Sequence, residues 1–318
     1  MVGARGPRGQ CRDGECNVGR DARNGAIVRV LVNGVRIYFE VVGEKLALVD
    51  GAIVEKPTLL VLHGGPGFDH HGMRGFYDRF ADVAQVVYLD HRGNGRSERG
   101  PLESLNLFQW GQDIKAFCEA LDIEKPIVLG HSFGGFVAES YVTQFPEHPG
   151  AIVLSCTQGR SDPGEASYAV YRRLGGPEVE AAAKAFFTDQ NLENMLEFQR
   201  LCRPHYNQSD STPWPLRNGI FTPETLIYFW REGVSPDEGA WRSFNFLPEF
   251  GKIVCPVLVL GGEDDPACPI EFQEEIMEFL PLGTGKLHRF AQCGHGTHVD
   301  HPDLTETIVR DFLAEVAG

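Results

Sequence analysis

Residues 127–136 read I-V-L-G-H-S-F-G-G-F, and this stretch decides the expected fold of the chain. The apolar, β-branched run over residues 127–130 predicts a strand, and the pattern over residues 133–145 predicts a helix directly after it. The backbone at such a sharp strand-to-helix turn is strained, and the glycines two positions before and after Ser132 leave room for it. The pattern therefore predicts that the hydroxyl of Ser132 stands exposed above a sheet as a candidate nucleophile.

Similar apolar runs lie on both sides of this stretch. Strands are predicted over residues 27–32, 35–42, 58–63, 85–90, 127–130, 151–155, 257–260 and 286–290. The first two are separated by Asn33-Gly34, a type I′ turn signal, so they should form an antiparallel hairpin. The other runs are continuous, which is typical of parallel strands covered on both faces, and helical patterns separate them over residues 76–83, 105–121, 133–145, 270–280 and 304–316. The sequence predicts an α/β fold, a mostly parallel sheet with helices on both faces.

The segment from residue 158 to residue 250 follows a different pattern. It has no convincing core strand, and its helical patterns cover residues 168–174, 179–187, 192–202 and 225–230. Three of the four tryptophans lie in it: Trp214, Trp230 and Trp241. A helical, aromatic-rich insertion into an α/β sheet predicts a cap over a pocket, with Trp230 as a candidate substrate contact.

These patterns divide the chain. Residues 26–157 and 251–318 are expected to form the α/β core, with residues 158–250 as the cap. Residues 1–25 are rich in Arg and Gly and have no apolar stretch behind them, so they are expected to be a disordered leader rather than a secretion signal.

The composition limits the classes of partner. The 318 residues include 29 Lys and Arg against 44 Asp and Glu, a formal net charge of −15, and no basic cluster stands out. Nucleic acids and anionic membranes bind clustered cations, so neither is an expected partner. No apolar run approaches the ~20 residues of a membrane-spanning helix. Eight cysteines without a C-x-x-C pair favour reduced thiols and a cytoplasmic protein.

A glycine-rich turn follows the strand predicted to end near residue 62. His63 begins the stretch H-G-G-P-G, whose glycines let the backbone fold back over the edge of the sheet. The amide of Gly65 can then meet the amide of Phe133 at one point, and together they would bind developing negative charge as an oxyanion hole. His63 and Gly64 are expected to line the substrate site.

A serine nucleophile needs a base and an acid, which in this architecture follow it in the order acid, then histidine. His295 follows the last predicted strand and is the candidate base. Three consecutive carboxylates, Glu263, Asp264 and Asp265, follow the strand before it. Their positions at the carboxyl ends of strands suit an acid, and the spacing by itself leaves the choice among them open.

Five motifs together resemble a known family. They are H-G-G-P-G at 63–67, D-x-R-G-x-G-R-S at 90–97, G-x-S-x-G-G at 130–135, D-x-x-C-P at 265–269 and C-G-H at 293–295. They resemble the α/β-hydrolase fold and, within it, most closely the proline iminopeptidase (prolyl aminopeptidase) family. The resemblance covers about residues 27–157 and 251–318. It implies a catalytic triad of Ser132, Asp265 and His295, an oxyanion hole of Gly65 and Phe133, and Cys268 beside the site.

The resemblance implies hydrolysis of an amide or ester through an acyl-enzyme, with release of an N-terminal proline or small residue. Family members commonly have Trp and Gln where this chain has Phe133 and His91. An aminopeptidase also needs a cap carboxylate for the α-ammonium group, because an unpaired buried charge is costly. The cap offers Glu165, Glu178, Glu180, Glu193, Glu197, Glu224, Glu232, Asp237 and Glu238.

Other functions remain open at this point. A carboxylesterase or a cofactor-free C–C bond hydrolase would use the same residues, and a ligand-binding protein of this fold with incidental turnover belongs to another class. In each case the expected partner is a small molecule or a short peptide, and nothing in the sequence predicts an oligomeric state.

Several tempting residues have ordinary interpretations. The stretch H-V-D-H at 298–301 lacks the first histidine of a zinc-hydrolase motif, so no metal is expected. The loop at 90–97 lacks G-x-G-x-x-G, so no dinucleotide or other cofactor is expected. Asp90 and Arg92 are expected to hold that loop by hydrogen bonds, and His70 and His71 to be surface residues at the start of a helix.

Overall fold

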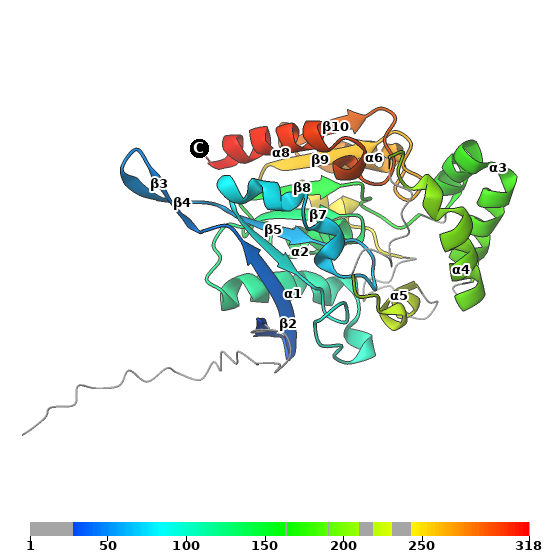
Figure 1. The fold of residues 1–318 in the computed structure, drawn as a ribbon, viewed down its shortest axis with the longest axis horizontal. Helices are drawn as coiled ribbons and strands as arrows, with labels where there is room; N and C mark the ends of the chain where they lie inside the picture. The colour runs from blue at the N-terminus through cyan, green and yellow to red at the C-terminus, as the bar shows by residue number, and fades with distance from the viewer. Residues whose placement is uncertain (1–27, 163, 190, 210–218, 231–242, 318) are drawn as a thin grey trace, which may run out of the picture.

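The computed structural model describes residues 28–162, 164–189, 191–209, 219–230 and 243–317. Within these ranges an eight-stranded sheet runs through the molecule in the order β1-β2-β6-β5-β7-β8-β9-β10 (Figure 1). The expected leader (residues 1–25), Trp214 and Trp241 lie outside the described residues. Among the described residues no helix is long and apolar enough to cross a bilayer.

The sheet is mostly parallel. Its strands are β1 (Arg29–Val32), β2 (Val35–Val42), β5 (Thr58–Leu62), β6 (Gln85–Leu89), β7 (Ile127–His131), β8 (Ala151–Ser155), β9 (Val257–Gly262) and β10 (Gly285–Phe290). β2 pairs antiparallel with β1 and β6, and every pairing from β6 to β10 is parallel. The predicted α/β fold is confirmed.

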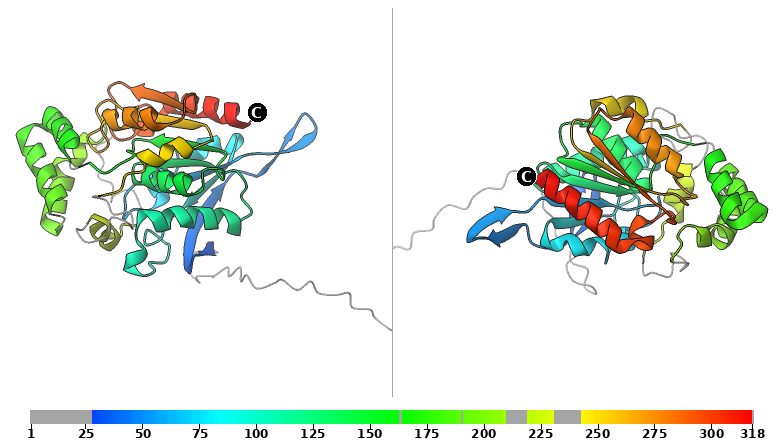
Figure 2. Two further views of the ribbon diagram at one scale, coloured as in Figure 1. Left: turned by 180° about the vertical axis from the view of Figure 1, so that it is seen from behind. Right: turned by 90° about the horizontal axis from the view of Figure 1, so that it is seen from above.

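Two hairpins stand at the start of the chain. Asn33 and Gly34 have φ of 45° and 82°, as a type I′ turn requires, so the predicted β1–β2 hairpin is confirmed. A second hairpin, β3 (Leu46–Val49) with β4 (Ala52–Glu55), projects from the body of the molecule (Figures 1 and 2) and was not predicted. Its strands are short and exposed, but the Asp50-Gly51 turn between them is a signal that could have revealed it.

Helices cover both faces of the sheet. Alternate residues of each central strand enter two different apolar clusters: Leu60 and Leu62 of β5 face one, and Leu59 and Val61 face the other. The first cluster is covered by α1 (Leu107–Ala120), α2 (Phe133–Gln144) and α6 (Ile270–Phe279). The second is covered by α8 (Pro302–Ala317) and the 3₁₀ segment η2 (Tyr77–Asp82). This double burial explains the continuous apolar runs.

The helix predicted over residues 76–83 is instead this single 3₁₀ segment. The carbonyl oxygen of Phe80 accepts the N–H groups of both Val83 and Ala84, and β6 begins at Gln85. The chain therefore turns into the next strand before an α-helix can develop.

Between β8 and β9 the chain forms a separate helical layer beyond the end of the sheet (Figure 1). It contains α3 (Glu165–Thr188), α4 (Leu192–Leu201) and α5 (Pro223–Trp230), with a 3₁₀ turn at Arg203–His205, and the short helix α7 (Thr297–Asp300) lies near it in the core. The two helices predicted over residues 168–174 and 179–187 are the two parts of α3, which meet at Gly176, where the backbone is not helical (φ 83°, ψ −173°), just before Pro177. Tyr171, Phe186 and Phe198 centre an apolar cluster of its own. Such a layer can act as a cap.

Candidate active site

The turn between β7 and α2 is as sharp as the sequence predicts. Ser132 has φ of 53°, a conformation that a non-glycine residue rarely adopts. A Cβ atom at Gly130 would lie 2.3 Å from the carbonyl oxygen of Gly134, and one at Gly134 would lie 2.3 Å from that of Leu62. The flanking positions must therefore be glycine for the Ser132 side chain to stand at the tip of the turn.

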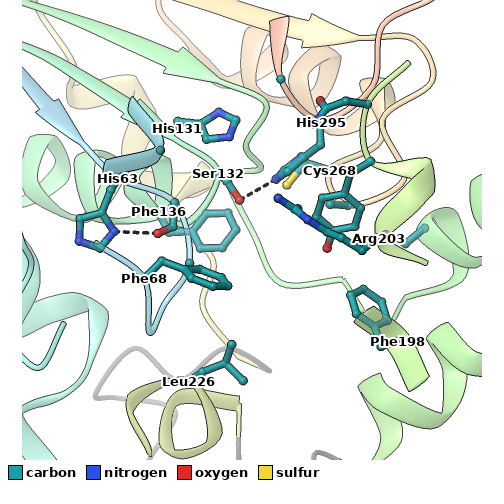
Figure 3. Close-up of a pocket in the computed structure, with 18 of the residues that line it drawn as sticks. His63, Phe68, His131, Ser132, Phe136, Phe198, Arg203, Leu226, Cys268 and His295 are labelled. Atoms are coloured by element: carbon teal, nitrogen blue, oxygen red, sulfur yellow. Dashed lines mark hydrogen bonds between the residues drawn. The ribbon is translucent and has the colours of Figure 1, made fainter. Parts of the chain in front are cut away.

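Ser132, His295 and Asp265 meet in a hydrogen-bonded chain, and Figure 3 shows its link between Ser132 and His295. The Ser132 Oγ lies 2.8 Å from His295 Nε2, and His295 Nδ1 lies 2.9 Å from both carboxylate oxygens of Asp265. Because the carboxylate only accepts, Nδ1 carries the proton and Nε2 is free to accept the hydroxyl hydrogen. The three residues follow β7, β9 and β10, so the sheet brings Ser132 together with His295, which lies 163 residues further along the chain.

The three consecutive carboxylates point in different directions. Only Asp265 faces His295, and it is fully buried, with Oδ1 accepting the N–H groups of Ala267 and Cys268. Asp264 forms an ion pair with Arg173 of α3 (2.5 Å), and Glu263 forms one with Arg289 of β10 (3.2 Å). The geometry therefore selects Asp265 as the partner of the imidazole.

The glycine-rich turn after β5 lies against Ser132. A Cβ atom at Gly64 would be 3.4 Å from the Cβ of Ser132, and Gly65 has φ of 134°, which favours glycine. Phe133 is the first residue of α2, so its N–H has no acceptor inside the helix and lies at the positive end of the helix dipole. Gly64 thus contacts Ser132, while the oxyanion hole of Gly65 and Phe133 stays a prediction.

His63 supports this turn from inside the wall of the pocket. Its Nδ1 donates to the carbonyl oxygen of Gly64 (2.7 Å; Figure 3), and its Nε2 accepts the backbone N–H of His91 (3.1 Å). The ring is 1% exposed, and burial lowers its pKa, so it is neutral. The His91 ring, in place of the family's glutamine, packs edge-on against Phe133 with centroids 5.5 Å apart.

A cavity of about 180 Å³ opens above Ser132 and His295. Both the core and the cap contribute aromatic and apolar side chains to its walls, and Figure 3 labels several of them. Trp230 and Cys268 lie in the walls, as expected. The other large apolar side chains in the walls are Phe68, Phe136, Phe186, Phe187, Phe198 and Leu226. Burial raises the pKa of the Cys268 thiol well above its ordinary value.

Charged side chains in the cavity wall are few among the described residues: Asp69, Asp162 and Arg203. Asp69 forms an ion pair with Arg96 (3.3 Å) and accepts the N–H of Ile220. Burial raises the pKa of Asp162, which accepts the N–H of Gly164.

Arg203 brings positive charge close to Ser132. Its guanidinium lies over the Tyr206 ring, 4.4 Å from the centroid, and its side chain extends from the cap toward Ser132 and His295 (Figure 3). Burial lowers the pKa of His131, the residue before Ser132, and the charge of Arg203 acts in the same direction. Arg203 therefore places a positive charge in the wall of the cavity that contains Ser132 and His295.

The cap carboxylates that the structure describes and that the sequence offered for an ammonium group do not line the cavity. Glu180 pairs with Lys184 and Arg172, and Glu197 pairs with Arg200. None of the six that the structure describes lines the cavity: Glu165, Glu178, Glu180, Glu193, Glu197 and Glu224. Glu232, Asp237 and Glu238 lie outside the described residues.

Two site features had no clear sequence signal. The backbone N–H of His295 donates to the carbonyl oxygen of Tyr206 in the cap (2.5 Å). The Asp300 carboxylate accepts the N–H groups of Gly294 and Gln208, and so fastens the cap to the histidine loop. Asp300 of the H-V-D-H stretch therefore has a structural role in joining the cap to the core. Among the described residues there is no cluster of three or more side chains that could hold a metal ion.

His70 is not a surface residue, contrary to the sequence interpretation. It is fully buried, and its Nδ1 lies 2.6 Å from Asp90 and its Nε2 3.4 Å from Glu40. Burial opposes the charged ring, but the contacts with the Asp90 and Glu40 carboxylates outweigh it and raise the pKa of His70 to about 9. In the loop at residues 90–97, Asp90 accepts the N–H of Arg96, and buried Arg92 donates twice to Asp113. The expected structural role of Asp90 and Arg92 is therefore confirmed.

Comparisons with known proteins show the family of the chain. The family model described as alpha/beta hydrolase fold matches residues 57–302, so the chain belongs to the α/β-hydrolase family. It is 29% identical over 265 residues to a 2-hydroxymuconate semialdehyde hydrolase of Pseudomonas sp. (strain CF600), covering 81% of this chain and 87% of that protein. It is 25% identical over 297 residues to the proline iminopeptidase of Lactobacillus helveticus (strain DPC 4571), covering 88% and 95%.

Solved structures show the same fold. The proline iminopeptidase of Mycobacterium smegmatis matches with a TM-score of 0.71 at 21% identity, covering 91% of this chain and 98% of that one. The meta-cleavage product hydrolase CumD of Pseudomonas fluorescens IP01 matches with a TM-score of 0.63 at 20% identity, covering 90% and 97%. The expected resemblance to proline iminopeptidases is confirmed, and a second kind of hydrolase shares it.

Proposed function

We propose that this protein is a serine hydrolase that acts through a covalent intermediate on Ser132. The hydrogen-bonded chain from Ser132 through His295 to Asp265, with links of 2.8 and 2.9 Å, supports the proposal. Ser132 Oγ attacks a carbonyl carbon while His295 Nε2 takes its proton, and Asp265 stabilises the imidazolium that results. The amides of Gly65 and Phe133 receive the negative charge on the carbonyl oxygen.

The second half of the reaction reuses the same groups. The imidazolium gives its proton to the leaving group as the bond to the carbonyl carbon breaks, which leaves an acyl group on Ser132. His295 then takes a proton from water, the hydroxide attacks the acyl carbon, and the returning proton frees Ser132. Every step uses only groups of this chain and water.

Release of an N-terminal proline or small residue from a peptide is the first candidate reaction. The sequence motifs and the relatives named proline iminopeptidase favour it. Such a substrate carries an ammonium group two bonds from the carbonyl that is attacked, and Asp162 or Asp69 would have to bind it in the described part of the cavity.

Hydrolysis of a carbon–carbon bond in a substrate that carries a carboxylate is the second candidate. Arg203 favours it, because a guanidinium near Ser132 attracts a carboxylate and repels an α-ammonium group. The relative named 2-hydroxymuconate semialdehyde hydrolase is consistent with this chemistry. A small carboxylic ester, as a third candidate substrate, would need neither an ammonium group nor a carboxylate.

One comparison of substrates separates these candidates. Turnover of proline p-nitroanilide, p-nitrophenyl butyrate and 2-hydroxymuconate semialdehyde is measured for the wild type, Ser132→Ala and Arg203→Met. Arg200→Met is the matched control, since Arg200 is an exposed cap arginine that pairs with Glu197 and does not line the described cavity. Anilide release that disappears in Ser132→Ala supports the aminopeptidase.

Turnover of the semialdehyde supports the second candidate if Arg203→Met raises KM by roughly tenfold or more and Arg200→Met leaves it unchanged. Ester release alone supports a carboxylesterase. Stoichiometric rather than repeated product release would favour a binding protein, and activity that survives in Ser132→Ala would contradict the serine-hydrolase proposal.

A further inference from the structure

A buried glutamine on α6 joins the segment after β8, which contacts Ser132, to the loop that carries Asp265. Gln273 is 0% exposed, and its Nε2 donates to the carbonyl oxygens of Thr157 and Cys268, the second at 3.1 Å. Because carbonyl oxygens only accept, the side-chain amide must turn its NH₂ group toward them. One side chain thus ties the segment after β8 to the loop after β9.

Each end of this bridge continues to a residue of the proposed triad. The hydroxyl of Thr157 donates to the carbonyl oxygen of Ser132 at 2.9 Å. The backbone N–H of Cys268 donates to Asp265 Oδ1, also at 2.9 Å. The nucleophile and the acid are therefore connected by hydrogen bonds and backbone through Gln273, by a path that does not include the imidazole.

The packing around Gln273 fits this position closely. A Cβ atom at Gly261 would lie 2.7 Å from the Oε1 of Gln273 and 2.5 Å from Ile270, so a side chain there would displace the amide. Gln273 does not belong to the described walls of the cavity. It can therefore act on the triad without touching a substrate.

We propose that Gln273 is a positioning residue, which holds the backbone of Ser132 and the carboxylate of Asp265 in the relative placement that His295 requires. The inference rests on the proposed function, because it assumes that Ser132 is the nucleophile. Without the amide, two buried carbonyl oxygens lose their donor and the two loops can relax apart. A displacement of about 1 Å at a reacting group can lower a rate by roughly a hundredfold.

The test measures the reaction of Ser132 itself. A p-nitrophenyl phosphonate inactivates a serine hydrolase with release of p-nitrophenol, so kinact and KI are obtained without a natural substrate. We expect Gln273→Met to lower kinact by about ten- to a hundredfold and to leave KI unchanged. Gln144→Met is the matched control. Gln144 is the last residue of α2, and its side chain also donates to two carbonyl oxygens, those of Phe108 in α1 and Ser140 in α2.

Two further variants, Thr157→Val and Gln273→Glu, test the proposal if Gln273→Met folds poorly. Thr157→Val removes the hydroxyl that donates to Ser132, and its effect on kinact should be less than additive with that of Gln273→Met, because both break one bridge. Gln273→Glu can donate only while its buried carboxyl is protonated, so its kinact should fall as the pH rises through the raised pKa of that carboxyl. Gln273 adjoins Cys268, and the titratable groups that act on the Cys268 thiol are Asp265, Cys156, Glu139 and Asp162.

The outcomes separate the positioning role from a structural role and from the proposed function. A lower melting temperature with unchanged kinact in Gln273→Met, or a change in KI alone, would overturn the inference. Equal losses in Gln273→Met and Gln144→Met would overturn it too. Failure of the phosphonate to label wild-type Ser132 would instead contradict the proposed function, and that result is read before any variant is compared.

Discussion

Gly294 of the core lies directly against the carbonyl oxygen of Tyr206 in the cap, where a Cβ atom would stand only 2.0 Å from that oxygen. The same oxygen accepts the backbone N–H of His295. The cap therefore contacts the base of the proposed triad through this backbone hydrogen bond, and the Tyr206 ring also packs edge-on against the His295 ring, with centroids 5.2 Å apart. The glycine of the C-G-H motif is needed for this contact between cap and core.

Substitution of Gly294 should damage the site more than the fold. In Gly294→Ala the new methyl group must push Tyr206 away and shift His295, so we expect turnover to fall by roughly a hundredfold. Gly251→Ala is the control, because a Cβ atom there meets no described atom within 4 Å. Activity and melting temperature are measured for both, and a fully active Gly294→Ala enzyme would mean that the cap can move without disturbing His295.

The choice of acid can be tested with two neighbouring residues. Asp265→Asn should lower kcat by about four orders of magnitude, because an amide favours the wrong tautomer of His295. Asp264→Asn should change kcat by less than about threefold, since Asp264 only forms a partly exposed ion pair with Arg173. The measurement is the Ser132-dependent hydrolysis of p-nitrophenyl butyrate, and the reverse ranking would make Asp264 the acid.

The buried thiol beside the site should react slowly. Burial and the nearby carboxylate of Asp265 raise the pKa of Cys268, so little thiolate is present at neutral pH. We expect a bulky maleimide to label Cys268 only slowly, faster at higher pH, and to block turnover once attached, because this side chain lines the cavity. Peptide mass mapping against residual activity checks this, with Cys268→Ala as the insensitive control; full labelling with unchanged turnover would contradict it.

The buried charge on His70 should make stability depend on pH. The pKa of its ring is raised from 6.5 to about 9, so its contribution is complete below pH 6.5 and is lost as the pH rises through about 9. The contribution is on the order of 3 kcal/mol, since one pKa unit corresponds to about 1.4 kcal/mol. Urea unfolding at pH 6 and pH 10 should show a loss in the wild type that is absent in His70→Gln. Replacing exposed His288 should leave the loss intact, and a pH-independent wild type would exclude a charged His70.

Much of the core could be predicted because local sequence and tertiary environment agree there. The continuous apolar runs of β5 and β7 reflect burial on both faces, and Asn33-Gly34 specifies its turn through backbone conformation alone. The elbow at Ser132 follows the same logic, because its glycines are required by contacts within a few residues or with the adjacent strand. Asp50-Gly51 carried a comparable signal, and the β3–β4 hairpin was missed only because its strands are short and exposed.

The sequence by itself thus determined the α/β fold, the positions of the proposed nucleophile and base, and the glycine-rich turn beside Ser132, since each is encoded in consecutive residues. The tertiary structure decided which of three adjacent carboxylates faces His295, the burial of His70 and the presence of Arg203 in the cavity. These depend on partners from distant elements: Arg173 and Arg289 draw Asp264 and Glu263 away, while Asp90 and Glu40 enclose His70. Contacts between segments far apart in the chain leave no local pattern, because a side chain's direction is set by what packs against it.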